Sequence, residues 1–384
     1  MNKYTAQKET KEVEVITTLV EQLCQVPDNR SDQGKRHSLE LILSIVLLGF
    51  LKGKTSVEAC CDFAKYRIGW FRDWFDQIPH GIPNPTTVSR ALEVTDPEPL
   101  VLAVSQFFNQ LIKKFEEVMS LDGKTIRAIH TCKDCCISHM LSLFSSLGRV
   151  VDQEGVVKKE NEITAAPRLL SRQVLYGITV TADALLTQKR ITKSIIESYG
   201  DYLLPVKDNH PDLQEIIEPT MFDPLSKLET ASITESRKTR QVTTTITLTK
   251  SFDTKALREE GWIGISQLGK LEREGFRIHK NRRTEINESI YLIASDPKLT
   301  PEKALEINRE HWGIENKLHW QKDYTLAEDR QRSRKKHSPE ILSYLRSTAI
   351  SILRQLYSSI TKALNQFNEQ PRAYKKMLTT LNIV

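Results

Sequence analysis

The chain has 384 residues, with 55 Lys or Arg, 49 Asp or Glu, and 39% hydrophobic residues. This length and apolar fraction allow two or three domains with buried cores and exclude a chain that is disordered throughout. The longest apolar run, residues 41–51, is far shorter than the roughly 20 residues of a membrane-spanning helix, so no membrane span is expected.

The N-terminal residues and the cysteine content indicate the compartment. Glu9, Glu12 and Glu14 stand where a signal peptide needs a basic start and an apolar centre. Six cysteines in the whole chain suit a reducing environment and suggest no disulfide framework. We therefore expect a cytoplasmic protein.

The net charge of +6 is concentrated at the C-terminal end. Residues 330–384 contain 11 basic and 2 acidic side chains, whereas the rest of the chain is close to balance. A basic end on a balanced protein favours a polyanionic partner, most simply nucleic acid. A solvated basic helix is the alternative, and charge alone does not decide between them.

Residues 1–110 predict an all-helical domain. Ser38 can cap an apolar helix that runs to about Leu51, and Ser56 can cap the next. Asn84 followed by Pro85 is a helix start, and the helix after it carries small polar residues and Arg90. Such a helix is able to face a DNA groove, or to pack as an ordinary surface helix. We predict a DNA-binding domain here.

Residues 115–207 and 295–335 predict an α+β core of the ribonuclease-H-like type. Strands are expected at 118–121, 137–144, 150–157, 174–181 and 202–206, with helices at 163–171 and 188–199. The order strand, strand, strand, helix, strand, helix, strand is that of ribonuclease-H-like domains. The pattern indicates where a site would lie and does not by itself assign a function.

The remaining segments predict an insertion and a helical end. Residues 208–294 contain strand-like runs at 243–250, 262–267 and 290–294, with charged residues between them, and predict a mostly β insertion. Thr300 and Pro301 begin a helix expected to reach about residue 322. Within the C-terminal basic helical region, 336–384, one amphipathic helix is expected at 339–365.

Three acidic residues occupy positions that this topology would bring together. Asp122 follows the first strand, Asp183 follows the fourth, and Glu315 lies on the late helix. Three neighbouring carboxylates repel one another unless a divalent cation lies between them. The pattern therefore predicts a metal site, with two Mg²⁺ ions that Mn²⁺ can replace. The alternative is that they are ordinary exposed acids at strand ends.

Several strings in the sequence resemble those of one protein family. They are Leu-Asp-Gly-Lys-Thr-Ile-Arg at 121–127, Asn-Glu-Ile-Thr at 161–164, His-Trp-Gly-Ile-Glu-Asn at 311–316, and Glu328, Asp329 and Arg332. They are similar to motifs of bacterial insertion-sequence transposases of the Asp-Asp-Glu (DDE) class, especially the H-repeat-associated subgroup. The N-terminal region resembles the helical domain associated with that family.

This resemblance implies a DNA transposase with Asp122, Asp183 and Glu315 as catalytic metal ligands. It implies hydrolysis of a phosphodiester at the element ends, strand transfer into target DNA, and a homo-oligomeric synaptic complex on double-stranded DNA. The wider group has Arg four residues before the Glu and Lys seven after it; here these positions hold His311 and Lys322, and Arg309 is a possible substitute.

The predicted DNA-contacting residues lie near the metal site and in the basic run. They are Lys189, Arg309, His311, His319, Lys322, Arg330, Arg332, Arg334, Lys335 and Lys336. Weaker candidates in the insertion are Arg277, Lys280, Arg282 and Arg283. A loop with Cys132, Cys135 and Cys136 is interpreted as containing incidental thiols, not a zinc site, because no second cysteine pair accompanies it.

Two other functions remain open from the sequence. A DNA-binding protein descended from a transposase could have lost cutting activity, although all three carboxylates are present. A metal-dependent nuclease without strand transfer would use the same site, so only an assay for joined products separates it from a transposase.

Overall fold

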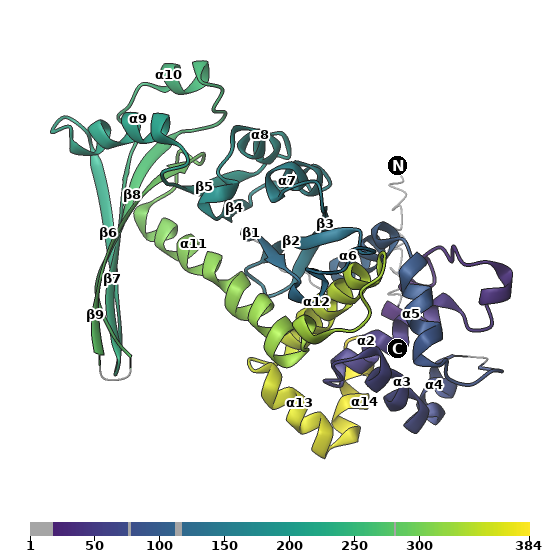
Figure 1. Ribbon diagram of the computed structural model, residues 1–384. Helices are drawn as coiled ribbons and strands as arrows, with labels where there is room; N and C mark the ends of the chain where they lie inside the picture. Colours follow the sequence, from purple (N-terminus) through teal and green to yellow (C-terminus); the bar gives the residue numbers. More distant parts are fainter. Residues whose placement is uncertain (1–17, 76–77, 112–116, 280–281) are drawn as a thin grey trace, which may run out of the picture.

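The computed structural model describes residues 18–75, 78–111, 117–279 and 282–384. Glu9, Glu12, Glu14 and Lys280, which entered the sequence predictions, lie outside these ranges. The described chain has a helical region made from both ends of the sequence, a central α/β core, and a long β arm (Figure 1).

One mixed sheet connects the core to the arm. Within the described residues its order is β3-β2-β1-β4-β5-β9-β8-β7-β6. The core strands are β1 (Val118–Thr125), β2 (Ile137–Ser145), β3 (Val150–Val157), β4 (Thr179–Ala182) and β5 (Asp201–Val206). β1, β4 and β5 are parallel, whereas β2 and β3 are antiparallel to their neighbours. The predicted order of core elements is confirmed.

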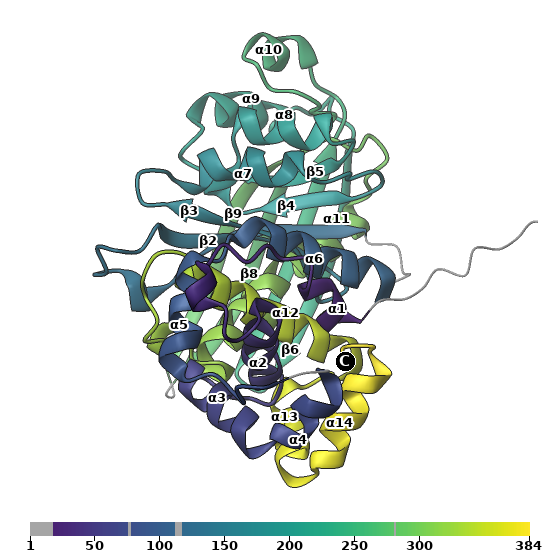
Figure 2. The ribbon, with the colours of Figure 1, turned by 90° about the vertical axis from the view of Figure 1, so that its right-hand side faces the viewer.

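Helices cover both faces of the core sheet. α7 (Glu162–Ser171) and α8 (Lys189–Glu197) share an apolar core with one face of β1, β4 and β5. α11 (Pro301–Ile314) packs on the other face, where Ala304 and Ile307 contact a separate cluster that reaches into the arm. Figure 2 shows α7 and α8 stacked beside β4 and β5. The face that receives α11 is therefore where a late acidic residue can approach β1.

The strand predicted at 174–181 begins later than expected. Gly177 has φ +73°, and Val174 and Tyr176 are exposed, so the chain makes a turn before β4 begins at Thr179. The apolar composition of this run was misleading, because its first residues belong to the turn. The strand nevertheless ends one residue before Asp183, as predicted.

The insertion is mostly β, as predicted, but its strands are longer than expected. β6 (Leu228–Arg237), β7 (Arg240–Thr249), β8 (Gln267–His279) and β9 (Arg282–Ala294) pair antiparallel in a projecting arm (Figure 1). Two helices, α9 (Pro211–Phe222) and α10 (Thr254–Glu259), lie at its base. The strand predicted at 262–267 is wrong, since β8 begins at Gln267. The charged residues placed between strands belong to β8 and β9, because both faces of the outer arm are solvated.

The two ends of the chain share one apolar core. The N-terminal helices are α1 (Leu19–Leu23), α2 (Leu39–Leu51), α3 (Val57–Tyr66), α4 (Ile68–Trp74), α5 (Pro85–Val94) and α6 (Pro97–Leu111). They pack with α12 (Ser338–Leu356), α13 (Ile360–Glu369) and α14 (Pro371–Thr380). For example, the Tyr374 hydroxyl donates to the Leu48 carbonyl at 2.7 Å.

The C-terminal helix is broken where the sequence predicted a continuous one. Tyr357 adopts an extended conformation, and Ser359 caps α13 through its side chain. The break lets α13 and α14 fold back on α2. In the part of the chain that the structure describes, no helix has both the length and the apolar composition needed to cross a membrane.

Candidate active site

Asp122 and Asp183 follow the last residue pair of the parallel β1–β4 pairing. The strand predicted at 118–121 continues to Thr125, because β1 still pairs with β2, so Asp122 lies within β1, whereas Asp183 directly follows β4. In the parallel pairing of β1 with β4, Leu121 lies opposite Ala182, so the next residue on each strand is an aspartate. The Asp122 carboxylate accepts a hydrogen bond from the Gly123 amide at 2.9 Å. Asp183 caps the short helix 184–186 and accepts from the Leu186 amide at 3.0 Å. The end of the parallel pair therefore presents two carboxylates.

Glu162 joins this site, although its role was not predicted. It is the first residue of α7, which Asn161 caps. A Cβ added at Gly123 would come within 1.7 Å of a Glu162 carboxylate oxygen, so only glycine leaves room for that side chain. Glu162 Oε1 also lies 3.3 Å from His139 Nε2. The Asn-Glu-Ile-Thr string contained this residue, but its place beside β1 depends on how α7 packs.

The electrostatics of Asp122 reflect three other carboxylates. Burial raises the pKa of Asp122 to about 7, and the charges of Asp183, Glu162 and Glu315 add to this effect. Burial also raises the pKa of Glu162, again with a contribution from Asp183. Each of these carboxylates therefore disfavours ionisation of its neighbours.

Glu315 lies where α11 changes its helical form. α11 ends at Ile314, and residues 315–319 and 321–325 continue as π-helical turns. The Ser120 hydroxyl donates to the Glu310 carbonyl at 3.4 Å, which joins β1 to this helix. The Glu310 carboxylate is 3.0 Å from Lys317 Nζ, whereas Glu315 acts on Asp122. π-helical turns are frequent at functional sites.

Two histidines with neutral rings lie near the acidic residues. His319 Nδ1 lies 3.4 Å from Asp122 Oδ2, and burial lowers the pKa of His319 to about 3, with Lys322 and Lys124 adding to the effect. Burial also lowers the pKa of His311, which Asp183 partly opposes. Near neutral pH both rings are thus hydrogen-bonding groups and not phosphate-attracting cations.

The prediction that Lys322 contacts phosphate is wrong. Its side chain is fully buried, with Nζ 3.2 Å from Glu328 Oε1 and 2.6 Å from the Ser343 hydroxyl. The error arose from assuming regular α-helical spacing after Glu315. A π-helical turn holds more residues per turn, so Lys322 rotates away from the face that carries Glu315.

Lys322 belongs to a buried ionic cluster beneath the site. Lys124 Nζ lies 2.8 Å from Asp323 and 3.1 Å from Glu328, and Arg346 of α12 donates to the Leu326 carbonyl at 3.1 Å. Burial alone would raise the pKa of Glu328, but the surrounding Lys322, Lys124 and Arg346 lower it to about 2. This buried ionic cluster connects the end of β1 to the π-helical turns and to α12.

The other predicted cations fall into two groups. Lys189 Nζ lies 3.5 Å from Glu260, and Arg309 pairs with Glu235 of β6, so both already have carboxylate partners. In contrast, the run Arg330, Arg332, Arg334, Lys335 and Lys336 is exposed, and its charged groups form no ion pair with the described residues. The run packs on the cysteine loop, where the Cys132 thiol donates to the Arg334 carbonyl at 3.2 Å.

The donor chemistry of the site suits a hard divalent cation. Among the described residues, no three or more His, Cys, Asp or Glu side chains are arranged closely enough to hold a metal ion as they stand. The Asp122 and Asp183 carboxylates instead accept the local hydrogen bonds given above. Carboxylate oxygens on adjacent strand ends nevertheless supply the ligand type and charge that Mg²⁺ requires. The residues present fit this cation.

Comparison with known families identifies the domains that contain these residues. The family model described as Transposase DDE domain matches residues 113–352, and the model described as DDE_Tnp_1-associated matches residues 20–108. The chain belongs to the DDE transposase family. The matched ranges contain Asp122, Asp183, Glu162 and Glu315 in one domain and α5 in the other.

Relatives with related names align along most of the chain. "Putative transposase YncI" of Escherichia coli O157:H7 is 29% identical over 352 residues, which are 88% of this chain and 88% of that protein. "H repeat-associated putative transposase YhhI" of Escherichia coli strain K12 is 28% identical over 349 residues, 88% of this chain and 90% of that protein. The resemblance to H-repeat-associated transposases that the motifs indicated is thus shown.

Proposed function

We propose that this protein catalyses DNA transposition: metal-dependent hydrolysis of phosphodiesters at element ends, then transfer of the freed 3′ ends into target DNA. The observation that carries the proposal is that Asp183 and Glu315, each from a different element of a DDE domain, act electrostatically on Asp122. A ribonuclease-H-like core is part of the proposal, supported by the strand order β3-β2-β1-β4-β5 with α7 and α8 between the parallel strands.

The three carboxylates would hold two Mg²⁺ ions, with Mn²⁺ as a substitute. Bound there, the ions would supply Lewis-acid chemistry, by polarising the phosphate and lowering the pKa of a water nucleophile. The chain itself supplies a rigid frame. The β1–β4 pairing fixes Asp122 relative to Asp183, and the Ser120 hydrogen bond holds the helix that carries Glu315.

Neighbouring groups orient the carboxylates. Neutral His319 beside Asp122 can fix one carboxylate oxygen without adding a charge that would repel the cations. Glu162 adds negative charge next to Asp122 and is held by α7 and His139. We assign both to positioning and attraction of the metal.

DNA would be held by charge outside the metal site. The exposed run 330–336 follows the π-helical turns directly, so a duplex at Glu315 would pass near it. Lys189, Arg309 and His311 remain weaker candidates, because Lys189 and Arg309 have carboxylate partners and His311 is neutral. We assign His319 to positioning Asp122 and not to contacting DNA. A homo-oligomer on paired element ends is part of the same proposal.

A cleavage assay tests this function. A labelled duplex carrying the flanking inverted repeat is incubated with the full chain and Mg²⁺ or Mn²⁺, and nicking is compared with that of Asp122→Ala, Asp183→Ala and Glu315→Ala. Each variant should lose cleavage and keep measurable DNA binding, because the phosphate-binding groups outside the site remain. Glu310→Ala is the control and should cleave normally. Unimpaired cleavage by any of the three variants would refute the assignment of that residue.

A further inference from the structure

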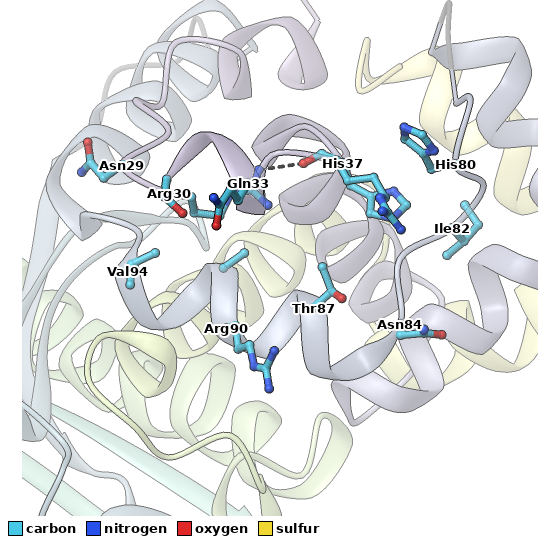
Figure 3. Close-up of a pocket in the computed structure, with 13 residues that line it drawn as sticks. Asn29, Arg30, Gln33, His37, His80, Ile82, Asn84, Thr87, Arg90 and Val94 are labelled. Carbon is cyan, nitrogen blue, oxygen red and sulfur yellow. Dashed lines mark hydrogen bonds between the residues drawn. The ribbon is translucent and has the colours of Figure 1, made fainter.

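The helical region contains a basic pocket of about 680 Å³ beside α5, and its lining includes none of the acidic residues of the candidate active site (Figure 3). Its lining includes Arg30, Arg36, His37, His80 and Arg90, together with neutral residues, and contains no Asp or Glu. A concave surface that gathers three arginines without a lining carboxylate concentrates positive potential. Burial lowers the pKa of His37, so its ring adds no charge near neutral pH.

The arginines that line this pocket differ in whether a carboxylate neutralises their charge. Arg30 is held by Asp28, with Nη2 2.6 Å from Oδ2, and donates to the His37 carbonyl at 2.7 Å, a bond drawn in Figure 3. Arg36 and Arg90 are exposed, and neither forms an ion pair with the described residues. Arg30 therefore shapes the wall, while Arg36 and Arg90 keep their charge available for a ligand.

The beginning of α5 forms the opposite wall. Asn84 and Thr87 line the pocket across from His37 and His80, whose rings are 6.1 Å apart (Figure 3). No side chain caps the α5 N-terminus, although Asn84 occupies the cap position. The helix end thus adds its partial positive charge to that of the arginines.

A second groove lies on the other side of α5. It has a volume of about 320 Å³, and its charged lining includes Arg90 and Arg332 as well as Glu58 and Glu93. Ser89 and Ser333 are within hydrogen-bond distance at 3.1 Å, so the basic run lies directly against α5. A small anion would need only one of these positions, whereas a polyanion can contact the pocket, Arg90 and Arg332 together.

We propose that the pocket beside α5 binds backbone phosphate of the DNA duplex, at a second contact separate from the scissile phosphate. This inference rests on DNA being the substrate of the proposed function. The duplex crosses α5 between Arg36 and Arg332, and the pocket anchors the DNA without taking part in the chemistry. Backbone contacts of this kind position DNA and carry no sequence information directly.

A charge inserted at Thr87 tests the proposal while favouring the fold. Thr87 is the third residue of α5, where a glutamate is favourable for a helix and can reach back to the cap residue. Thr87→Glu should repel phosphate, and Thr87→Gln has the same shape without the charge. The double variant Arg36→Gln/Arg90→Gln removes the two available cations, and Arg36→Lys/Arg90→Lys retains the charge.

Binding of the full-length variants to a labelled duplex is measured by fluorescence anisotropy between 0.05 and 0.3 M salt. Thr87→Glu should abolish the binding of about one phosphate. The plot of log affinity against log salt should then be less steep by about 0.9, and the affinity at 0.1 M salt should fall roughly tenfold. Arg36→Gln/Arg90→Gln should make the same plot less steep by about 1.8. Thr87→Gln and the lysine pair should behave like the wild type. Equal slopes for wild type and Thr87→Glu would overturn the proposal.

Two further measurements separate the possible failures. If inorganic phosphate, compared with chloride at equal ionic strength, raises the Tm of the wild type but not of Thr87→Glu, while DNA affinity is unchanged, the pocket binds a small phosphate and not DNA. A wild type that binds DNA as described but does not nick it would contradict the proposed function and leave this inference intact. A wild type that binds no duplex would overturn both.

Discussion

Glu162 illustrates why a site residue can escape prediction from sequence. Asp122 and Asp183 were predictable because parallel strands bring their carboxyl ends together, and the β1–β4 register does place the two residues level. Glu162 begins α7, which follows β3 in the chain. Its side chain can approach β1 only because Gly123 has no Cβ. The distance between a helix start and a neighbouring strand is set by packing, which no local pattern encodes.

Replacing Glu162 by Gln should weaken metal binding without unfolding the protein. The change removes one of the three carboxylates whose charges act on Asp122, so the affinity for Mn²⁺ should fall about tenfold, in the range seen when groups around metal ligands are removed. The affinity is measured by electron paramagnetic resonance of free Mn²⁺ during titration. Glu160→Gln is the control, since Glu160 pairs with Arg168 at the surface. Equal affinities of wild type and Glu162→Gln would exclude the proposed role.

At the scale of elements, the π-helical turns after Ile314 have the largest consequences. They begin at Glu315, whose charge acts on Asp122, and turn Lys322 into the buried ionic cluster with Glu328. The residue types from 311 to 325 suit an ordinary α-helix, so the sequence predicted the helix and its length well but the direction of Lys322 wrongly. The break at Tyr357 was missed for a similar reason, because apolar residues continue on both sides of it.

Glu328→Gln should destabilise the fold by about 3–5 kcal/mol, since it leaves Lys322 and Lys124 near each other without their common partner. Urea denaturation followed by circular dichroism gives the free energy of unfolding. Glu215→Gln changes an exposed glutamate of α9 and should alter stability by no more than about 0.5 kcal/mol. A Glu328→Gln protein as stable as the wild type would show that the buried ionic cluster does not support the site.

The same cluster predicts a dependence on acid pH. The cations around Glu328 hold its pKa near 2 in the folded protein, below the value of roughly 4.3 in an unfolded chain. Its contribution to stability is therefore complete above roughly pH 4.3 and decreases as the pH falls toward 2. The difference in unfolding free energy between wild type and Glu328→Gln should shrink over this interval. A difference that is constant from pH 7 to pH 3 would contradict this account.

At the scale of the whole molecule, both chain ends form one helical body beside the DDE domain. α12 contacts the N-terminal helices, and its Arg346 reaches the segment that follows the π-helical turns. The charge surplus of residues 330–384 was visible in the sequence, and its exposed cations are the run 330–336 together with Lys362, Arg372, Lys375 and Lys376. Arg346 itself is buried, over the ring of Phe50 at 4.6 Å. Net charge therefore indicated a polyanion without locating the contacting residues.

Neutralising the basic run should weaken binding to all DNA alike. The triple variant Arg332→Gln/Arg334→Gln/Lys335→Gln should flatten the salt dependence of affinity by roughly two to three units, about 0.9 for each phosphate that is no longer bound. Anisotropy titrations with an element-end duplex and an unrelated duplex give the slopes. The control neutralises three exposed cations of the insertion: Lys250, Lys255 and Arg258. Unchanged slopes would show that the run is only solvated surface.

The central claim is that one carboxylate site both cuts DNA and joins it to a target. The measurement that tests it most directly is a strand-transfer assay with duplexes that end in the element's 3′ hydroxyl, a plasmid target and Mg²⁺, in which joined products are separated by gel electrophoresis. The wild type should form covalently joined products, and Asp122→Asn should form none while binding the same DNA. Nicking by the wild type without joined products, or joining by Asp122→Asn at the wild-type rate, would contradict the account.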